Sequence, residues 1–494
     1  MSIDSILILL LATPLISALV IFIMPINFKL NSSLHLLASA ASSVVGLKAV
    51  YSVVNGETLF AYNKLLFLDS VGGVFLSLIA LTGLLINIYS VSYMKWEIDK
   101  NAITVKDAKL FFVLSHIFIF TMTFSVIANN IALMWAAIEA TTLSSVFMVA
   151  LYKSKRSTES GWKYIVICSI GLAFALYATV LLYGAGFVVI QDSHSTMLWT
   201  TLRDHAQELN PDALKLIFVF ALIGFGTKAG LAPTHTWLPD VHSEGPSPAS
   251  AMLSAVLLKC AVLAIVRYYA IVGQSMIGFE YVQTLMLIIS LLTIFIAALF
   301  ILRQHDIKRM FAYHSVEHIG IIAFGFGIGG PLGIFAGLFH AMSHSLTKAL
   351  AFCISGNIMK IYGTRDMQKM GGLVKIAPIT AILFGISVCS LAGVPPLSIF
   401  LSEFFVIKAA IVTGQYLAVV LFIIGLAVVF VGLFSHFNHI MFGECKSEVV
   451  GKEVAWSANL PLVALAVLIV IFGVFSFESW ITLLNNATKI IIGH

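Results

Sequence analysis

Long apolar runs separated by short polar loops recur from one end of the chain to the other. A run of about twenty apolar residues is long enough to cross a hydrocarbon core of ~30 Å as an α-helix. The pattern predicts an all-α membrane protein with about fourteen transmembrane helices in one polytopic domain over residues 1–494. The expected spans are residues 5–25, 33–54, 69–93, 110–128, 130–151, 164–189, 213–232, 248–271, 281–302, 309–328, 331–358, 376–412, 416–441 and 457–477.

The composition agrees with a membrane protein and narrows the chemistry. Of 494 residues, 60% are hydrophobic and 10% are charged, against roughly a quarter charged in a soluble domain. The first run lacks a basic leader and a small-residue cleavage motif, so we expect a retained helix and not a signal peptide. The net charge of +5 suits anionic lipid headgroups better than nucleic acid. The five cysteines have no C-x-x-C spacing, so we expect no metal site, disulfide framework or cofactor.

The basic residues of the loops are divided unequally between the two sides of the membrane. Of 28 Lys and Arg, six lie within or near the ends of the spans, and alternating the loops places eighteen on one side and four on the other. The positive-inside rule makes the rich side cytoplasmic. We therefore expect a multi-pass protein of the cell inner (cytoplasmic) membrane with both termini on the non-cytoplasmic side. The four residues on the poor side are Lys64, Arg203, Lys215 and Lys489.

Two of the expected helices contain Pro-rich interruptions. The seventh helix runs into residues 230–233 (GLAP) and the twelfth into residues 392–396 (AGVPP), and a Pro inside a helix removes a backbone donor and clashes with the preceding turn. We expect both helices to be broken, with the freed backbone groups lining a wet path; the alternative is that the match is accidental, since Pro is common in transmembrane helices. The breaks lie five helices apart, which suggests a repeating unit of five helices. A unit with an odd number of crossings ends on the opposite side of the membrane, so its second copy must start from that side. Helices 4–8 and 9–13 are therefore predicted to form two inverted repeats. The resulting divisions are N-terminal helices 1–3 (1–108), a first repeat (109–272), a second repeat (280–441) and a C-terminal helix with a tail (457–494).

Ionisable side chains remain within the apolar spans after the loops are set aside. A charge near the bilayer centre costs about 2.5–3.5 kcal/mol on insertion scales unless it is paired or hydrated. So many buried charges in one chain indicate a function that uses them. The residues are Lys48, Lys228, Lys259, Arg267, Lys348, Lys408, Glu139, Glu317 and Glu403.

Four of these residues lie in the first predicted repeat, and three of them suggest a path for protons. Glu139 is in the fifth helix, and Lys228 directly precedes the break in the seventh. A Glu–Lys pair between the two helices would offset the cost of burying each charge, and moving the partners apart would let the lysine release its proton. Lys259, midway along the eighth helix, is then the onward site.

A second set of residues follows one face of the eleventh helix. His340, His344 and Lys348 are spaced at i, i+4 and i+8, which places them on a single stripe. Histidine both donates and accepts protons near neutral pH, so the stripe is typical of a proton wire. Glu403, shortly after the second break, would be the terminal carboxylate. Further candidates are His235, His436 and His439.

The remaining buried polar residues have simpler interpretations. For His35, His116 and Lys48 we favour structural contacts between helices. Arg267 and Lys408 are expected to extend their charged ends to the membrane interface while their aliphatic parts stay buried.

Several long motifs occur in the order found in a known family. They are residues 226–248 (GTKAGLAPTHTWLPDVHSEGPSP), 306–315 (DIKRMFAYHS), 340–350 (HAMSHSLTKAL) and 393–396 (GVPP) ahead of 402–404 (SEF). Over about residues 70–440, the chain resembles the proton-pumping membrane subunits of respiratory complex I and the similar Mrp-type cation/proton antiporter subunits.

The resemblance implies a fourteen-helix fold with two inverted five-helix units and a buried hydrophilic axis along which protons pass. It implies that Glu139 and Lys228 form a pair, that Lys259 and Lys348 continue the axis and that Glu403 ends it. A glutamate at this last position is similar to the chain M branch of complex I, since the chain L and chain N branches tend to have lysine.

One motif departs from the complex I pattern. Where those chains usually read Ser-x-x-Gln-Met-Gly, this chain has SVEHIG at residues 315–320, which adds Glu317 and His318 to the tenth helix. Together with residues 139–143 (EATTL), this resembles the hydrogenase 4 component F branch, found with membrane-bound nickel-iron hydrogenases and formate hydrogenlyase-type complexes. Glu317 and His318 either extend the axis, couple to a partner or form a local hydrogen bond that fixes the tenth helix.

Three functions share this fold. We favour a proton-translocating membrane subunit of a redox-driven complex, either hydrogenase 4/formate hydrogenlyase-like or NADH:quinone oxidoreductase-like, with no cofactor chemistry of its own. Its expected partners are the lipid bilayer, other membrane subunits and a peripheral redox arm that includes nickel-iron hydrogenase and iron-sulfur subunits, but no nucleic acid. The alternatives are a component of a Mrp-type cation/proton antiporter and a proton-path subunit of an inorganic-carbon uptake complex.

Overall fold

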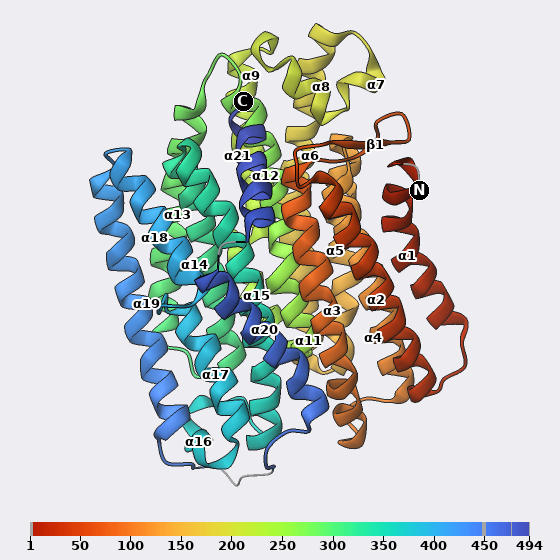
Figure 1. Cartoon of the computed structure of the whole chain (residues 1–494), viewed down its shortest axis with the longest axis vertical. Coiled ribbons are helices and arrows are strands. Elements are labelled where there is room, and N and C mark those ends of the chain that lie inside the picture. Colours follow the sequence, from red (N-terminus) through yellow and green to blue (C-terminus); the bar gives the residue numbers. More distant parts are fainter. Residues whose placement is uncertain (1–2, 447–450, 476, 494) are drawn as a thin grey trace.

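Long helices that run from one end of the molecule to the other form the bundle seen in Figure 1, in a computed structural model that describes residues 3–446, 451–475 and 477–493. The N-terminal part forms α1 (Ile3–Ile23), α2 (Phe28–Val53), β1 (Leu59–Ala61), β2 (Leu66–Leu68), α3 (Ser70–Asp99), α4 (Val105–Ile127), α5 (Ile131–Val149) and α6 (Lys155–Ile190). The middle part forms α7 (Ser193–Thr196), α8 (Trp199–Asp204), α9 (Pro211–Ala229), α10 (Trp237–Glu244), α11 (Ser247–Met252), α12 (Leu258–Gly273), α13 (Phe279–Ile301), α14 (Ile307–Ile328) and α15 (Gly330–Tyr362). The C-terminal part forms α16 (Leu373–Ile376), α17 (Pro378–Leu391), α18 (Ser398–Val412), α19 (Tyr416–Phe442), α20 (Trp456–Val474) and α21 (Glu478–Ile492).

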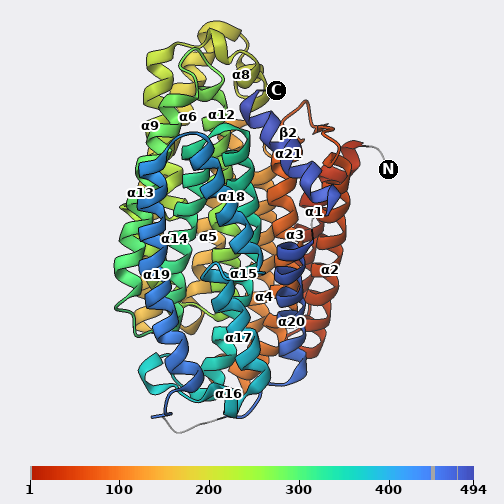
Figure 2. The same ribbon diagram turned by 60° about the vertical axis from the view of Figure 1, so that its left-hand side comes forward.

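Helices are present at all the places where the sequence predicts spans, whereas the number of membrane crossings stays a prediction. Each overlaps one helix, except that residues 248–271 comprise α11, a π turn and α12, and residues 376–412 comprise α17 and α18. In the part of the chain that the structure describes, eleven helices are long and apolar enough to cross a membrane. Both termini lie toward the end of the bundle that carries α7 and α8, away from α16 (Figures 1 and 2).

The C-terminal tail is helical, which the hydropathy pattern did not predict. α21 follows α20 almost directly and continues toward the C-terminus (Figure 2). Its buried apolar residues, Leu483, Leu484, Ala487 and Ile491, recur at helical spacing on one face, and α21 packs on α3, α12 and α15. The other face is polar, so the segment does not read as an apolar span. The short antiparallel hairpin of β1 and β2 and the small helices α7 and α8 were also missed, because none is long enough to show a period.

Both helix breaks predicted from the prolines are present. α9 ends at Ala229 in a left-handed Gly230 (φ 87°), and a short 3₁₀ turn at Thr234–Thr236 separates it from α10. In the same way, α17 ends at Leu391 and α18 begins at Ser398. The breaks fall at corresponding places in the two expected repeats, and the inverted relation of those repeats stays a prediction.

Small residues let α6 and α9 approach closely. A Cβ added to Gly224 would collide with the backbone of Ala175, and one added to Gly171 would collide with Thr227. Close approach through small residues is a common way for membrane helices to pack. The contact fixes the C-terminal end of α9, which carries Lys228, against α6.

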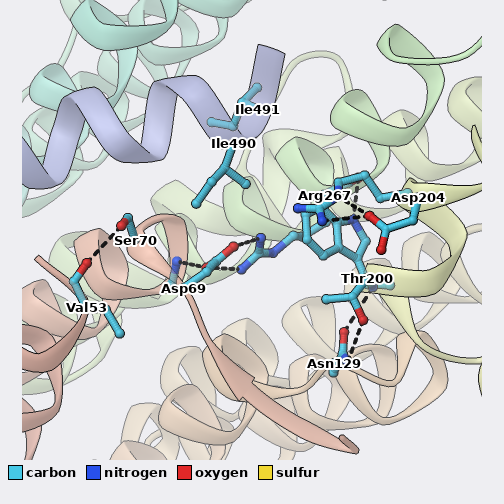
Figure 3. Close-up of polar contacts among 12 residues, drawn as sticks. Val53, Asp69, Ser70, Asn129, Thr200, Asp204, Arg267, Ile490 and Ile491 are labelled. Carbon is cyan, nitrogen blue, oxygen red and sulfur yellow. Dashed lines mark hydrogen bonds and ion pairs between the residues drawn. The ribbon is translucent and has the colours of Figure 1, made fainter. Parts of the chain in front are cut away.

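A buried ion pair joins α12 to the start of α3 (Figure 3). Arg267 Nη1 and Nη2 donate to Asp69 Oδ2 and Oδ1 at 2.6 and 2.7 Å, and both side chains are 3% exposed. Asp69 also caps α3 by accepting from the Gly72 amide at 2.7 Å, and the guanidinium lies over the rings of Phe67 and Trp199. The expectation that Arg267 extends to the interface is therefore wrong, because a carboxylate 198 residues away in sequence supplies its partner inside the protein.

The other polar residues with simple interpretations divide into two groups. His35 and His116 contact each other between α2 and α4, with Nδ1 of His35 3.1 Å from Nε2 of His116, as predicted. Lys48 is exposed on α2, so the predicted helix–helix contact is wrong for this residue. Lys408 is exposed on α18.

Candidate functional site

The buried ionisable residues come from five elements of the bundle interior. Lys228 (α9), Lys259 (α12) and Lys348 (α15) are each no more than 1% exposed, Glu403 (α18) is 8% exposed, and Glu139 (α5) is half-buried. Burial of this degree requires each charged group to have a polar partner. The partners show how these residues are connected.

Lys228 lies between α5 and α6. Its Nζ donates to Thr142 Oγ1 and to the Tyr164 hydroxyl, both at 2.7 Å, and lies 4.5 Å from the centre of the Tyr164 ring. Trp237 stacks on Tyr164 from the far side of the helix break. The two residues that bond Lys228 were missed, because a hydroxyl in an apolar helix more often bonds its own backbone.

Glu139 does not contact Lys228 directly. Its Oε1 accepts from Ser169 at 2.9 Å, its Oε2 is buried without a hydrogen bond, and the ion pairs of the described residues do not include one between Glu139 and Lys228. Thr142, which does bond Lys228, lies three residues after Glu139, on the same face of α5. The carboxylate is thus about one helical turn from the residue that bonds the lysine, and one of its oxygens has no hydrogen-bond partner among the described residues.

Lys259 is bonded to a distorted turn of its own helix. Residues Leu253–Leu257 form a π turn before α12, and π turns leave backbone carbonyls without their usual partners. Lys259 Nζ donates to the Ser254 carbonyl at 2.6 Å, and the Ser345 hydroxyl donates to the Ala255 carbonyl at 2.6 Å. The π turn therefore supplies acceptors in a helix that would otherwise have none free.

A series of short contacts joins Lys259 to Lys348. The hydroxyls of Ser254 and Ser315 lie 2.7 Å apart, and Ser315 donates to the Phe311 carbonyl at 3.0 Å. Lys348 Nζ donates to the same carbonyl at 2.7 Å. Ser254 and Ser315 lie in the first and second predicted repeats, so this bridge crosses between them. Nothing in the sequence separates these two serines from the many others of the apolar helices.

Histidines of α14 and α15 form the next part of the site. His340 Nε2 lies 3.0 Å from His318 Nδ1, and His340 Nδ1 lies 2.9 Å from the Ser402 hydroxyl. The ring of His344 stacks on that of His318 at 4.7 Å between centroids. The stripe predicted on the eleventh helix is therefore completed by a histidine of the tenth, and it leads to Ser402, next to Glu403.

Two carboxylates line one cavity. Glu317 and Glu403 border a space of about 570 Å³ whose other walls are apolar and come from α17, α18, α19 and the break after α17. Glu317 Oε2 lies 3.0 Å from His314 Nδ1. Gly393 in the break lies against the Glu403 carboxylate, where a Cβ would collide with it. The second break thus makes room for the carboxylate predicted to end the axis.

The remaining candidates lie at the edges of this site. His235 is 5% exposed beside the first break, with its ring edge toward Tyr313. His436 is half-buried on α19, whereas His439, near the end of that helix, has Nε2 3.4 Å from the carbonyl of Gln368, in the short 3₁₀ helix Met367–Lys369.

Lys308, which the sequence placed among the basic loop residues, is instead buried. It is 2% exposed in the first turn of α14, where its Nζ donates to the Gly245 carbonyl. Arg365 bonds Glu244 and Asp306 beside it. The positive-inside count included Lys308 because its position at the start of a span cannot reveal burial by neighbouring loops.

The chain is similar to known membrane proteins along most of its length. Residues 128–429 match the family described as "NADH:quinone oxidoreductase/Mrp antiporter, TM". The chain is 35% identical to the hydrogenase-4 component F homolog of Methylacidiphilum infernorum (isolate V4) over 451 residues, which cover 91% of this chain and 92% of that protein. It is 32% identical to an Na(+)/H(+) antiporter subunit of Alkalihalophilus pseudofirmus over 338 residues, 68% of this chain and 66% of that one.

The fold agrees with these sequence relationships. A chain in the structure of the Mrp complex from Dietzia sp. DQ12-45-1b superposes with a TM-score of 0.88 at 21% identity, covering 100% of this chain and 98% of that chain. The family match covers more than half of the sequence, and the relative with 35% identity extends over nearly all of it. The chain is therefore a multi-pass integral membrane protein that belongs to the NADH:quinone oxidoreductase/Mrp antiporter family.

Proposed function

We propose that this chain moves protons across the membrane as one subunit of a redox-driven complex, of hydrogenase 4/formate hydrogenlyase type or NADH:quinone oxidoreductase type. The observation that carries the proposal is the series of contacts from Lys259 through Ser254 and Ser315 to Lys348. Each hydrogen bond in the series is 3.0 Å or shorter. The two ammonium groups are held on backbone carbonyls, which accept but cannot pass on a proton, so the Ser254 and Ser315 hydroxyls between them, together with water, are the groups that relay it in this proposal. Buried ionisable residues in membrane helices mark such routes.

The proposed route begins at Glu139 and Lys228. A charge movement in a partner subunit brings the free Glu139 oxygen toward Lys228 or takes it away, which changes how strongly the lysine holds its proton. Lys228 then releases the proton through water toward Lys259. In the structure Glu139 and Lys228 bond different residues and not each other. This supports the step, because an unpaired carboxylate and ammonium on neighbouring helices can form a contact and break it again when a partner subunit moves.

In the second half, protons pass from Lys348 to the histidines and then to a carboxylate. His344, His318 and His340 lie within stacking or hydrogen-bonding distance of one another, and neutral imidazole both accepts and donates. Glu403 ends the route at the cavity that it shares with Glu317. Glu317 and His318 thus extend the axis in this proposal, while His235, His436 and His439 stay outside the main series.

The partners and the orientation are part of the same proposal. The similarity to a hydrogenase-4 component F homolog supports assembly with other membrane subunits and with a peripheral arm of nickel-iron and iron-sulfur subunits. The inner membrane, with both termini on the non-cytoplasmic side, follows from the distribution of loop charges. Termini at one end of the bundle (Figure 1) support an even number of crossings.

A sodium/proton antiporter component is the second candidate. It is favoured by the 32% identity to an Na(+)/H(+) antiporter subunit. Purification of the tagged full-length chain from native membranes in a mild detergent, followed by mass spectrometry and compared with an untagged strain, separates the candidates. We expect nickel-iron and iron-sulfur subunits to copurify. Recovery of antiporter subunits alone, or of a carbonic-anhydrase-like protein, would contradict the redox assignment.

The serine bridge gives a direct test of the route. Replacing both serines (Ser254→Ala with Ser315→Ala) is expected to slow proton pumping several-fold, because the contact between the Lys259 turn and the Lys348 acceptor loses its two hydroxyls. The measurement is the initial rate of pH change in membrane vesicles, per electron transferred. Ser275→Ala with Ser290→Ala is a matched control, since these buried hydroxyls donate only to backbone carbonyls of their own segments. Equal pumping by the two double variants would exclude the bridge.

A further inference from the structure

We propose that His314, Glu317 and His318 form a binding site for a divalent transition-metal ion of the zinc type. Their ligand atoms all lie within 4.8 Å of one another, and the three side chains are buried. The two histidines are four residues apart on α14, the spacing that places two imidazoles on one metal ion from one helix face. This proposal departs from the sequence-based expectation of no metal site, which considered only cysteine spacing.

The carboxylate is the centre of the group. Glu317 Oε2 lies 3.0 Å from His314 Nδ1 and 4.0 Å from His318 Nε2. Zinc bonds of about 2.0–2.2 Å require ligand atoms roughly 3.4 Å apart in a tetrahedral site. The first separation is short enough, and the second must shrink by about 0.6 Å. The two imidazole nitrogens lie within 4.8 Å of each other and must approach by up to about 1.4 Å, which rotation of the side chains can supply.

The hydrogen-bond directions around His318 leave its Nε2 free as a ligand. The Ser402 hydroxyl donates to the Ile399 carbonyl at 2.7 Å, so it accepts from Nδ1–H of His340. Nε2 of a neutral His340 is then an acceptor and takes the hydrogen of His318 Nδ1. A neutral His318 therefore has a lone pair on Nε2, which is buried and without a hydrogen-bond partner among the described residues.

This arrangement leaves the lone pair of His318 Nε2 4.0 Å from Glu317 Oε2, which is already 3.0 Å from His314 Nδ1. A metal ion among the three atoms replaces the hydrogen between His314 and Glu317 and binds the free lone pair of His318 as well. The hydrogen bond from His318 Nδ1 to His340, continued to Ser402, is the kind of outer contact that orients a metal-binding histidine. Two imidazoles and one carboxylate suit Zn²⁺ and its neighbours, whereas Mg²⁺ and Ca²⁺ prefer oxygen ligands alone.

A cavity borders the group. Glu317 lines the space of about 570 Å³ that also contains the Glu403 carboxylate, so a second carboxylate near the proposed ion adds to its electrostatic attraction. A metal ion bound to Nε2 of His318 would occupy the position that a moving proton needs, so the ion would block the route. This consequence depends on the proposed function, whereas metal binding itself does not.

Binding is tested on the purified full-length chain by titration with Zn²⁺ against a competing chelator. We expect one tight site per chain, insensitive to Mg²⁺, and at least about tenfold weaker in Glu317→Gln and His314→Asn. His194→Asn, which changes an exposed histidine, is the matched control and should bind as the wild type does. Equal affinity in all variants, or loss only in the control, would overturn the site.

A second variant, read out by absorption spectroscopy, tests the site even if Glu317→Gln does not fold. With Co²⁺ as the probe, His314→Cys should gain an intense thiolate-to-cobalt band in the near ultraviolet that the wild type lacks, because the new sulfur would bind the metal. An unchanged spectrum would overturn the site even if Glu317→Gln failed to fold.

A separate measurement tests the block. Zn²⁺ at the concentration that fills the site should stop proton pumping in vesicles, and continued pumping with the site filled would contradict a position on the route. Pumping by a Lys228→Met variant without added metal tests the proposed route separately. If that variant does not pump, the route stands, and continued pumping of the wild type with Zn²⁺ bound then contradicts only the position of the metal site on it.

Discussion

Lys228→Met is expected to lower the rate of proton pumping by at least about 100-fold, while the complex still assembles. Methionine fills the space of the lysine in the contact between α9 and α6 but cannot hold a proton, so the route loses the site from which Lys259 is supplied. The hydroxyls of Thr142 and Tyr164 lose the ammonium group that donates to them, and the Tyr164 hydroxyl keeps the Ser145 hydroxyl as a partner at 2.8 Å. Pumping is measured as acidification of inverted vesicles with a pH-sensitive dye, and assembly by recovery of the partner subunits.

Two variants make this result specific. Lys215→Met changes an exposed lysine of the same helix, whose nearest carboxylate is Asp212 at 3.4 Å, and it should pump normally. Lys228→Arg retains the positive charge but holds its proton permanently, so it should be inactive if proton release matters and active if only charge matters. A Lys228→Met complex that pumps at the wild-type rate would refute the proposed route.

Arg267→Met is expected to cause the largest loss of stability, about 3–5 kcal/mol. The change leaves Asp69 as an unpaired negative charge that is 2% exposed, and breaking a buried pair costs far more than breaking an exposed one. It also removes the guanidinium that stacks on Phe67 and Trp199. The free energy of unfolding in mixed micelles, followed by denaturant titration, measures the effect.

The controls separate charge burial from packing. Lys95→Met breaks an ion pair with Asp99 in which both side chains are more than half exposed, and it should cost less than about 1 kcal/mol. Combining Arg267→Met with Asp69→Asn removes the unpaired charge but retains a side chain able to cap α3, so it should recover part of the loss. If Arg267→Met were as stable as Lys95→Met, the buried pair would contribute no more than a surface contact.

Much of the fold follows from the sequence, because a membrane imposes strong local constraints. Each span must be apolar over its length, and a Pro inside a span must break it, so the breaks after Ala229 and Leu391 could be predicted from the prolines. The stripe of His340, His344 and Lys348 could be predicted for a similar reason, since helical spacing alone places these residues on one face. The family motifs add the order of Glu139, Lys228, Lys259, Lys348 and Glu403.

Other features have no local signal. α21 is amphipathic and short, so hydropathy treats it as a tail, and Lys308 has the same sequence context as an exposed basic residue. The expectations for Arg267 and Lys48 were wrong because the depth of a side chain depends on which helix covers it. Burial is a property of the packed bundle and is not encoded in the residues that flank a position.

The sequence by itself determined the class of protein, the broken helices and most of the ionisable residues that lie inside the bundle. Tertiary structure alone decided how those residues are connected: the hydroxyls of Ser254 and Ser315 across the two halves, Thr142 and Tyr164 on Lys228, Asp69 on Arg267, and the convergence of His314, Glu317 and His318 beside a cavity. The physical reason is the range of the interactions. Hydropathy and proline geometry act within one turn or one span, whereas a hydrogen bond between Ser254 and Ser315, 61 residues apart, requires the relative position of two packed helices.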